Sequence, residues 1–303
     1  MTDGNNNVVL LDGGMGQELR RRSSRPASPL WSAQVMLDEP HLVTAAHRDF
    51  IDAGARVITV NTYSATPQRL ARDGNPEMFE PLQAAALNAA HKAREESGQD
   101  VRIAGCLPPL VGSYHPEVVP DDATCLRDYR RIVELQAAGV DLFLCETMSL
   151  VREARAATIA AAESGLPVWV SFTVDDSDGT RLRSGETLAE AAQEVVNAGA
   201  ERVLVNCSVP EAVTAGMDEL AKVGMPFGGY ANGFTSVAPL QPGGTVDSLE
   251  ARTDLDPAGY AAHALRWIKQ GATIVGGCCE VGPAHIAALG ERLTAQGYRL
   301  VAP

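Results

Sequence analysis

The chain has 303 residues, 45% of them hydrophobic, which is enough apolar material to bury a full core. Its formal net charge of −13 repels phosphate backbones, which argues against nucleic-acid binding. Residues 1–7 are polar and no run of about 18 apolar residues occurs, so we expect a cytoplasmic protein with neither an export signal nor a membrane span.

Short apolar runs recur along the whole chain and predict strands that are buried on both faces of a parallel sheet. These runs cover residues 8–11, 57–60, 101–104, 142–145, 168–172, 203–205, 226–229 and 273–275. Alanine-rich amphipathic stretches between the runs predict helices. They cover residues 41–53, 81–96, 125–138, 150–164, 187–198, 212–223 and 257–270.

The order of these elements predicts the fold. Helices end at a glycine that precedes the next strand, as at Gly54, Gly165, Gly199 and Gly271. Eight strands joined by helical crossovers are what a (β/α)8 TIM barrel requires. A doubly wound sheet is the rival, but no G-x-G-x-x-G phosphate loop follows the first strand. We therefore predict an α/β fold, a single-domain TIM barrel over residues 1–303.

Two stretches interrupt this pattern. Residues 20–31 are basic and rich in Ser and Pro, and residues 232–256 are rich in Gly, Pro and Thr. Both follow predicted strands, so we expect both to be loops on the C-terminal face, where barrel enzymes build their active sites.

Three of the six cysteines stand just after predicted strands. Cys207 follows Asn206, and the pair Cys278 and Cys279 follows two glycines. Thiolates select zinc among common divalent ions, and three protein ligands leave a fourth position open for catalysis. Buried structural cysteine is the alternative, but Gly276 and Gly277 favour a metal because glycines let the backbone approach a bound group.

Three motifs resemble the homocysteine S-methyltransferase family. They are LLDGGMGQEL at residues 10–19, VNCS at residues 205–208 and GGCCEVGPAHI at residues 276–286. The resemblance extends from Val8 to Leu293. The family includes S-methylmethionine-dependent and betaine-dependent enzymes and the homocysteine module of cobalamin-dependent methionine synthase. It implies a (β/α)8 barrel in which Cys207, Cys278 and Cys279 hold Zn²⁺ while the homocysteine thiol takes the open position.

The resemblance also implies residues that hold the amino-acid substrate. They are Asp12, the backbone of Gly13 and Gly14, and Glu146, while Tyr63 matches a tyrosine near the metal in the betaine branch. The alternatives are a turn-capping role for Asp12, a structural salt bridge for Glu146 and simple packing for Tyr63.

Other polar and sulfur-bearing residues carry weaker signals. Asn206 is a candidate for hydrogen bonding to substrate, and its alternative role is to fix a loop. Cys106, Cys125 and Cys145 lack paired ligand spacing, so we expect inert buried thiols. The histidines show no metal-ligand spacing, so we assign them no metal.

These observations predict a zinc-dependent transfer of a methyl group to homocysteine, which yields methionine. A sulfonium donor leaves as a neutral thioether, so no general acid is required. We rank S-methylmethionine ahead of S-adenosylmethionine. Betaine is disfavoured because Thr147 replaces an aromatic of the betaine branch, and only Trp31, Tyr63 and Tyr230 lie near strand ends to build a cage for a quaternary ammonium.

Two other functions remain open. The same chemistry could act on selenocysteine or another thiol, and a non-catalytic zinc or redox sensor could use the vicinal Cys278–Cys279 pair. For partners we expect only small-molecule substrates, with no nucleic acid and no membrane, in a monomer or small homo-oligomer. Departures from the family pattern, such as Glu280 after the cysteine pair, concern the donor pocket more than the zinc site.

Overall fold

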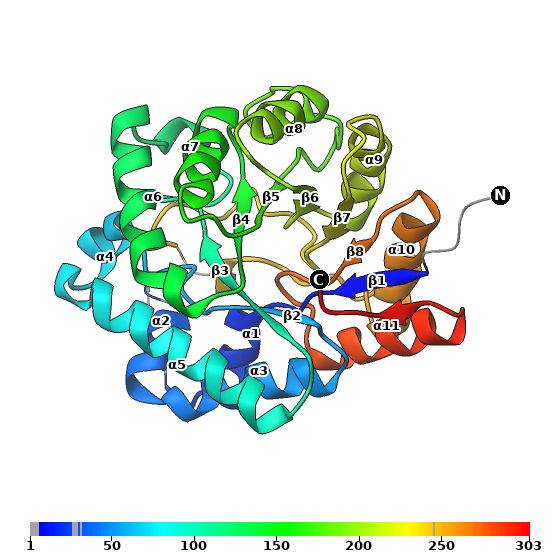
Figure 1. The fold of residues 1–303 in the computed structure, drawn as a ribbon, viewed down its shortest axis with the longest axis horizontal. Coiled ribbons are helices and arrows are strands. Elements are labelled where there is room, and N and C mark those ends of the chain that lie inside the picture. Colours follow the sequence, from blue (N-terminus) through cyan, green and yellow to red (C-terminus); the bar gives the residue numbers. More distant parts are fainter. Residues whose placement is uncertain (1–5, 26–29, 31, 245) are drawn as a thin grey trace.

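Strands lie at the centre of the molecule and helices surround them (Figure 1). This computed structural model describes residues 6–25, 30, 32–244 and 246–303. The strands are β1 (Asn7–Leu10), β2 (Val57–Thr59), β3 (Arg102–Leu107), β4 (Leu142–Met148), β5 (Val168–Phe172), β6 (Arg202–Asn206), β7 (Phe227–Tyr230), β8 (Ile274–Val275) and β9 (Arg299–Leu300). All eight predicted strands are present, shifted or extended by up to three residues.

The strands form one curled parallel sheet in the order β2-β3-β4-β5-β6-β7-β8-β1-β9. Every pairing between neighbouring strands is parallel. The chain after β1 also returns to β2, because Leu11 and Val57 form a parallel bridge and the Asp12 amide donates to the Val57 carbonyl at 3.0 Å. The predicted α/β class with a parallel sheet is therefore confirmed. β9 was not predicted, because Arg299 is charged and exposed and no continuous apolar run marks this strand.

The helices cover the outer face of the sheet (Figure 1). They are α1 (Met15–Arg22), α2 (Ser32–Asp38), α3 (Pro40–Asp52), α4 (Pro67–Asp73), α5 (Phe79–Ser97), α6 (Asp122–Gln136), α7 (Val151–Ala162), α8 (Leu188–Asn197), α9 (Pro210–Ala221), α10 (Pro257–Lys269) and α11 (Pro283–Ala295). Polar N-cap side chains fix the starts of α6, α8 and α10. Asp121 accepts a hydrogen bond from the Thr124 amide, so α6 begins three residues before its predicted start.

The two stretches that interrupt the pattern differ in outcome. Residues 20–22 were predicted as loop but form the last turn of α1, where Arg22 pairs with Glu18 at 2.6 Å, one turn earlier. Residues 26–29 and 31 of the first stretch lie outside the described residues. The second stretch is largely irregular, with one antiparallel bridge between Phe234 and Ala251 and a short 3-10 helix at Val246–Ser248.

Strand side chains alternate between two apolar layers. Those of Val8 and Leu10 join the large cluster between sheet and helices, while those of Val9 and Leu11 join a smaller cluster inside the curl of the sheet. This inner cluster includes Trp169, which is 1% exposed. Buried apolar residues thus fill the interior of the sheet, and the polar residues of the site collect at the carboxyl ends of the strands.

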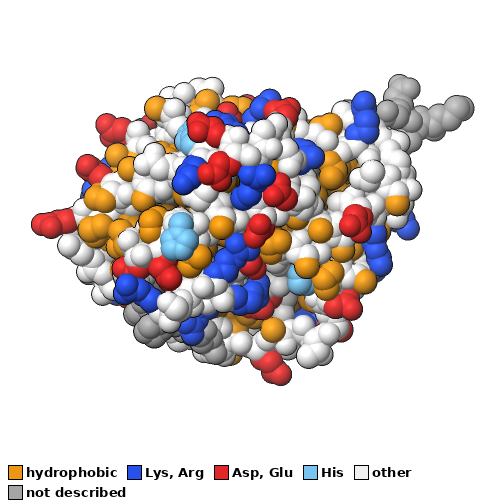
Figure 2. Space-filling model, turned by 90° about the horizontal axis from the view of Figure 1, so that it is seen from below, with side chains coloured by type: hydrophobic (Ala, Val, Ile, Leu, Met, Phe, Trp, Pro, Cys, Tyr) orange, Lys and Arg blue, Asp and Glu red, His pale blue; other side chains and the backbone are white. Residues whose placement is uncertain are grey.

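Charged side chains are dispersed over the surface. On the face shown in Figure 2, acidic and basic groups are interspersed. Many pair with neighbours on one helix, as Arg48 does with Asp52 at 3.1 Å and Lys222 with Glu219 at 2.6 Å. Among the described residues, no helix is both long and apolar enough to cross a bilayer.

Candidate active site

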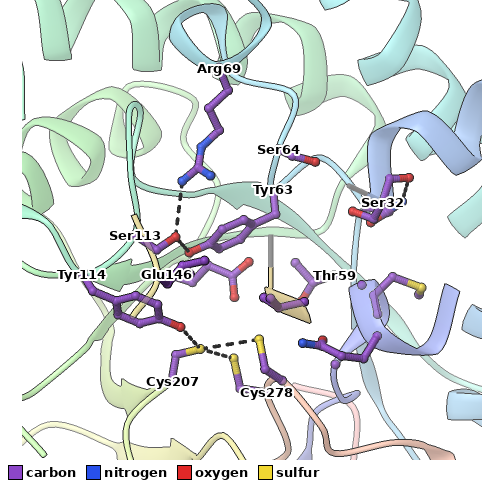
Figure 3. A pocket seen from close by; sticks show the side chains of 18 of the residues that line it. Ser32, Thr59, Tyr63, Ser64, Arg69, Ser113, Tyr114, Glu146, Cys207 and Cys278 are labelled. Atoms are coloured by element: carbon purple, nitrogen blue, oxygen red, sulfur yellow. Dashed lines mark hydrogen bonds between the residues drawn. The ribbon is translucent and has the colours of Figure 1, made fainter. Parts of the chain in front are cut away.

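Three cysteine sulfurs meet at one end of the sheet (Figure 3). Cys207 follows β6, and Cys278 and Cys279 follow β8; their Sγ atoms all lie within 4.8 Å of one another. The Sγ of Cys207 is 2.7 Å from that of Cys278 and 3.9 Å from that of Cys279. The predicted association of these residues across about seventy positions of sequence is therefore present in the structure.

The donor set fits a soft divalent metal. Zinc bound tetrahedrally by sulfur at about 2.3 Å separates its ligand sulfurs by roughly 3.8 Å. The distance between Cys207 and Cys279 already matches, and Cys278 would move outward by about 1 Å to match as well. Cys207 and Cys279 are buried and Cys278 is half-buried, and all three line the same cavity, so a fourth ligand can approach from the cavity side.

The three thiols differ in proton affinity, because the pKa of Cys207 is lowered while those of Cys278 and Cys279 are raised. Hydrogen bonding with the Cys278 and Cys279 thiols holds the pKa of Cys207 well below its ordinary value, despite burial. The hydroxyl of Tyr114 also lies 3.0 Å from the Cys207 sulfur and acts in the same direction. Cys207 is consequently the sulfur best disposed to be a thiolate before any ligand binds.

Backbone strain concentrates around this centre. Within the described residues, positive φ outside glycine occurs at Tyr114 (70°), Thr147 (60°), Cys207 (49°) and Glu280 (66°). Each residue lines the cavity or directly follows a residue that does. Such conformations cost on the order of 1–3 kcal/mol each and persist where the surrounding structure holds them, as active sites do.

Two glycines after β1 allow the chain to pass against the cysteine loop. A Cβ on Gly13 would lie 2.1 Å from the Val281 carbonyl oxygen, and one on Gly14 would lie 2.5 Å from the Cys278 carbonyl oxygen. The Gly14 amide already donates to Val281 at 2.8 Å, while no described residue accepts from the Gly13 amide. The turn thereby sets the position of the cysteine loop and leaves one amide of the pair for a ligand.

The glycines that precede the cysteine pair correct one argument from the sequence. We expected Gly276 and Gly277 to let the backbone approach a bound group. Instead, a Cβ on Gly276 would meet the Leu11 side chain at 2.5 Å, and a Cβ on Gly277 would meet Val281 at 2.1 Å. These two positions lack side chains because the backbone packs closely against Leu11 and Val281, and not because a bound group approaches it.

Two carboxylates line the cavity beside the sulfurs. Burial raises the pKa of Asp12 to about 8 and that of Glu146 to about 7. Asp12 accepts a hydrogen bond from the Thr59 amide at 2.8 Å. The negative charge of Glu146 repels that of Asp12 and so raises the pKa of Asp12 further. Buried carboxylates with raised pKa values in a cavity are typical of sites that await a cationic group.

Cys106 is buried, as expected, and burial raises the pKa of its thiol well above the ordinary value, but it contacts a residue of the site. Its sulfur donates to Glu146 Oε1 at 3.1 Å, from β3 to β4, and this hydrogen bond lowers the pKa of Glu146 against the larger effect of burial. Cys125 and Cys145 are fully buried in the apolar core, where the Cys125 thiol donates to the Pro120 carbonyl oxygen at 3.4 Å. Neither belongs to the residues that line the cavity.

Aromatic and amide groups complete the lining. The Tyr63 hydroxyl lies 2.8 Å from Ser113 Oγ, and the buried hydroxyl of Tyr230 lies beside Glu146, whose pKa it lowers. The two amide atoms of Gln17, which is 4% exposed, have no partner within hydrogen-bond distance among the residues that the structure describes, but the amide lies near enough to Cys279 to lower the pKa of that thiol. Unsatisfied polar atoms in a cavity indicate a polar ligand, because each is costly when left unpaired.

Asn206 is placed differently from the other candidates. It is fully buried and does not line the cavity. Its Oδ1 accepts from the Thr147 amide at 2.9 Å and from Ser171 Oγ at 2.8 Å, and its Nδ2 donates to Thr147 Oγ1 at 2.8 Å. These partners leave little capacity for a substrate, so the geometry supports the alternative in which Asn206 holds the strained backbone at Thr147, next to Glu146.

Reasoning from the sequence missed Tyr114, Gln17 and Arg69, all of which line the cavity. Tyr114 lies in the loop after β3, and no spacing pattern marks it. Gln17 stands inside the first motif, but a single glutamine carries no chemical signal of its own. Trp31, which we considered as a possible cation-binding aromatic, lies outside the described residues.

Comparison with known proteins identifies the family. The family model for homocysteine S-methyltransferase matches residues 9–293. The chain belongs to the homocysteine S-methyltransferase family. The homocysteine S-methyltransferase of Escherichia coli K12 is 32% identical over 306 residues, covering 94% of this chain and 95% of that protein. The selenocysteine Se-methyltransferase of Brassica oleracea var. italica is 28% identical, covering 95% of this chain and 89% of that protein.

A solved homocysteine methyltransferase shares the fold. The crystal structure of MmuM from Escherichia coli in its metallated form is similar with a TM-score of 0.79 and 29% identity, covering 94% of this chain and 96% of that one. The apo form of the same enzyme is similar with a TM-score of 0.72. The predicted family and enzyme class are thus confirmed, and a cysteine cluster capable of binding a metal is present in this homocysteine S-methyltransferase family member.

Proposed function

We propose that this protein transfers a methyl group from a sulfonium donor to the sulfur of L-homocysteine, and that its Cys207, Cys278 and Cys279 bind zinc. The observation that carries the proposal is the meeting of three thiols with two buried carboxylates, Asp12 and Glu146, in one cavity. Membership of the family supports the same activity.

We also propose that the curled sheet closes as a (β/α)8 barrel within a single domain. The bridge between Leu11 and Val57 supports closure, because it joins the chain after β1 to β2, at the other end of the strand order. Closure would gather the ends of β1, β2, β3, β4, β6, β7 and β8 around one axis, and the cavity lining comes from these strands and the segments that follow them.

The acceptor would bind with its sulfur toward the three cysteines. Zinc, when bound, would lower the proton affinity of the homocysteine thiol while leaving the sulfur nucleophilic. Glu146 and Asp12 would hold the substrate ammonium by charge-assisted hydrogen bonds, and the Gly13 amide would donate to its carboxylate. A bound ammonium favours the ionised carboxylates and so offsets part of the desolvation that raises their pKa values.

The transfer step requires no further acid or base. The thiol proton leaves to solvent, and a lone pair of the thiolate forms the new bond between sulfur and the methyl carbon. The bond between that carbon and the donor sulfur breaks, and its electron pair remains on the donor as a neutral thioether. The protein contributes by aligning the three atoms in line and by excluding competing water.

The structure alters the argument about the donor. Tyr63, Tyr114 and Tyr230 all line the cavity, so this site has one more tyrosine than reasoning from the sequence counted. Aromatic faces attract sulfonium and quaternary ammonium ions alike. Our preference for S-methylmethionine over betaine therefore rests on the leaving group, since a thioether departs more readily than a tertiary amine, and on Thr147 at the position after Glu146.

A donor and acceptor panel tests the proposal. Zinc-loaded protein is mixed with homocysteine and either S-methylmethionine, S-adenosylmethionine or betaine, and methionine is quantified. We expect the highest turnover with S-methylmethionine. Turnover on betaine equal to or above it would overturn the choice of donor, and absence of methionine with every donor would overturn the proposed reaction. Selenocysteine in place of homocysteine tests the second acceptor, which the relative from Brassica oleracea suggests.

The same panel separates catalysis from sensing. A zinc or redox sensor that uses Cys278 and Cys279 would release metal on oxidation without turning over any methyl donor. Methionine formation that depends on the metal and on reduced cysteines contradicts that reading.

A further inference from the structure

We propose that Arg69, together with Ser113, binds the carboxylate of the methyl donor, so that the donor is a sulfonium compound that carries a carboxylate. The inference rests on the proposed function, because it takes the cavity above the cysteines as the place where donor and acceptor meet. It adds a recognition group that neither the motifs nor the zinc chemistry requires.

The guanidinium of Arg69 projects from α4 into the cavity wall (Figure 3). Its Nη2 donates to the Pro109 carbonyl at 3.1 Å and to Ser113 Oγ at 3.3 Å, and its Cζ lies 5.3 Å from the ring centre of Tyr63. Its Nη1 donates to no described residue. The hydroxyl of Ser113 lies next to this group, 2.8 Å from that of Tyr63, so the guanidinium and the Ser113 hydroxyl together can contact two carboxylate oxygens.

This arginine has no anionic partner among the described residues. Its hydrogen-bond acceptors are a carbonyl and a hydroxyl, both neutral, and burial lowers the pKa of its guanidinium. Glu153 attracts the guanidinium electrostatically but forms no ion pair with it. Glu153 Oε1 instead accepts hydrogen bonds from the Leu110 amide and the Tyr129 hydroxyl. A half-buried cation without a direct counter-ion, in the wall of a ligand cavity, is suited to an anion supplied by the ligand.

The neighbouring arginine shows the contrast. Arg72 also lines the cavity, but its guanidinium pairs with Asp73 at 2.5 Å and donates to the Val111 carbonyl at 2.9 Å. Its charge is therefore already satisfied within the protein. Arg69 is the cavity-lining arginine that retains binding capacity among the residues that the structure describes.

The distribution of charge assigns Arg69 to the donor. Asp12 and Glu146 lie on the side of the sulfurs, where the homocysteine ammonium would bind, and the carboxylate of homocysteine is attached to the same carbon as that ammonium. In Figure 3 the Tyr63 ring lies between Arg69 and the cysteines. A second molecule whose sulfonium faces the acceptor sulfur can extend past Tyr63 and place its own carboxylate at Arg69.

The test compares two donors that differ by the carboxylate alone. They are S-methylmethionine and its decarboxylated analogue, (3-aminopropyl)dimethylsulfonium. Binding to zinc-loaded protein is measured by calorimetry, and transfer is measured as methionine formed from homocysteine. The variants are Arg69→Gln, Arg69→Lys and, as a matched control, Arg56→Gln. Arg56 is likewise half-buried, bonds the neutral Ala55 carbonyl and Gln99 side chain, and does not line the cavity.

We expect Arg69→Gln to weaken binding of S-methylmethionine by about tenfold or more, the usual worth of a hydrogen bond to a charged group, and to leave the analogue within about twofold. Arg69→Lys should fall between Arg69→Gln and the parent, and Arg56→Gln should match the parent with both donors. Equal losses with both donors, or no loss with either, would overturn the inference, because a purely structural role for Arg69 does not depend on the donor carboxylate.

Failure of the inference can be told from failure of the proposed reaction. If S-methylmethionine binds in an Arg69-dependent way but the parent protein forms no methionine, the carboxylate site stands and the methyl transfer is rejected. If the parent forms methionine and Arg69→Gln reduces this equally for both donors, the methyl transfer stands and the carboxylate site is rejected. If Arg69→Gln lowers the thermal midpoint so far that it cannot be assayed, the charge-conserving Arg69→Lys variant provides the same comparison.

Discussion

Replacing Glu146 by Gln tests the proposed ammonium anchor, and its effect can be worked out from the structure. Burial raises the pKa of this carboxyl from 4.5 to about 7, so it is mostly neutral below pH 7 and mostly ionised above. Only the ionised form attracts an ammonium strongly. The ionised fraction rises roughly tenfold between pH 6 and pH 8, and kcat/KM for homocysteine should rise in proportion.

The Glu146→Gln variant should lose this dependence. At pH 8 its kcat/KM should fall by about ten- to hundredfold, which corresponds to the roughly 1.5–3 kcal/mol of a hydrogen bond to a charged group. Only a weaker dependence near pH 8, from Asp12, should remain. Zinc content should be unchanged because Glu146 is not among the three sulfur ligands.

A second variant tests the same reasoning by shifting the pKa. Cys106→Ala removes the thiol that donates to Glu146 at 3.1 Å and lowers its pKa. The rising limb of the pH profile should therefore move to higher pH. The assay is the initial rate of methionine formation at limiting homocysteine across pH 5.5 to about 9, with the donor saturating. A Glu146→Gln variant that keeps the limb near pH 7 and stays within about twofold of the parent would refute the assignment.

Four other substitutions are expected to separate structural from binding roles. Cys207→Ala should abolish zinc binding and turnover, measured by metal analysis, whereas Cys125→Ala, which removes a buried thiol remote from the cavity, should retain zinc; full zinc in the Cys207 variant would contradict the metal site. Asn206→Ala should lower the free energy of unfolding in urea by about 2–4 kcal/mol with KM nearly unchanged, and the opposite pattern would restore a direct contact with substrate. Gly14→Ala should cost about 1–3 kcal/mol of stability and reduce zinc content, since its Cβ would lie 2.5 Å from a carbonyl oxygen of the cysteine loop; a variant with normal zinc and thermal midpoint would show that the loop can move aside.

The fold was predictable where burial acts on many residues at once. Continuous apolar runs and glycine turns located β1 to β8, and Ala-rich amphipathic stretches located α3 and α5 to α10, because burial of many residues produces a clear pattern, whereas the short helices α1, α2 and α4 were not predicted. The residues at 20–22 were misjudged for a local reason. Three arginines suggest a loop by composition, but pairing of Arg22 with Glu18 stabilises the last helical turn.

The site was predictable only where a motif carries the chemistry. Cys207, Cys278 and Cys279 could be grouped because strand ends meet at one edge of the sheet, whatever their separation in sequence. The contact between Cys106 and Glu146 depends on the register of β3 against β4, which the sequence does not reveal. The role of Arg69 depends on which carboxylates lie near it, and only the folded chain shows that its direct partners are neutral.

The most direct test of the account is X-ray absorption at the zinc edge, measured on the zinc-loaded protein before and after addition of homocysteine. We expect three sulfur ligands at about 2.3 Å without the substrate and four with it, because the homocysteine thiol should take the position that Cys207, Cys278 and Cys279 leave open. A sulfur count that stays at three when homocysteine is bound, or a metal held by oxygen or nitrogen in place of these cysteines, would contradict the proposed activation of the acceptor.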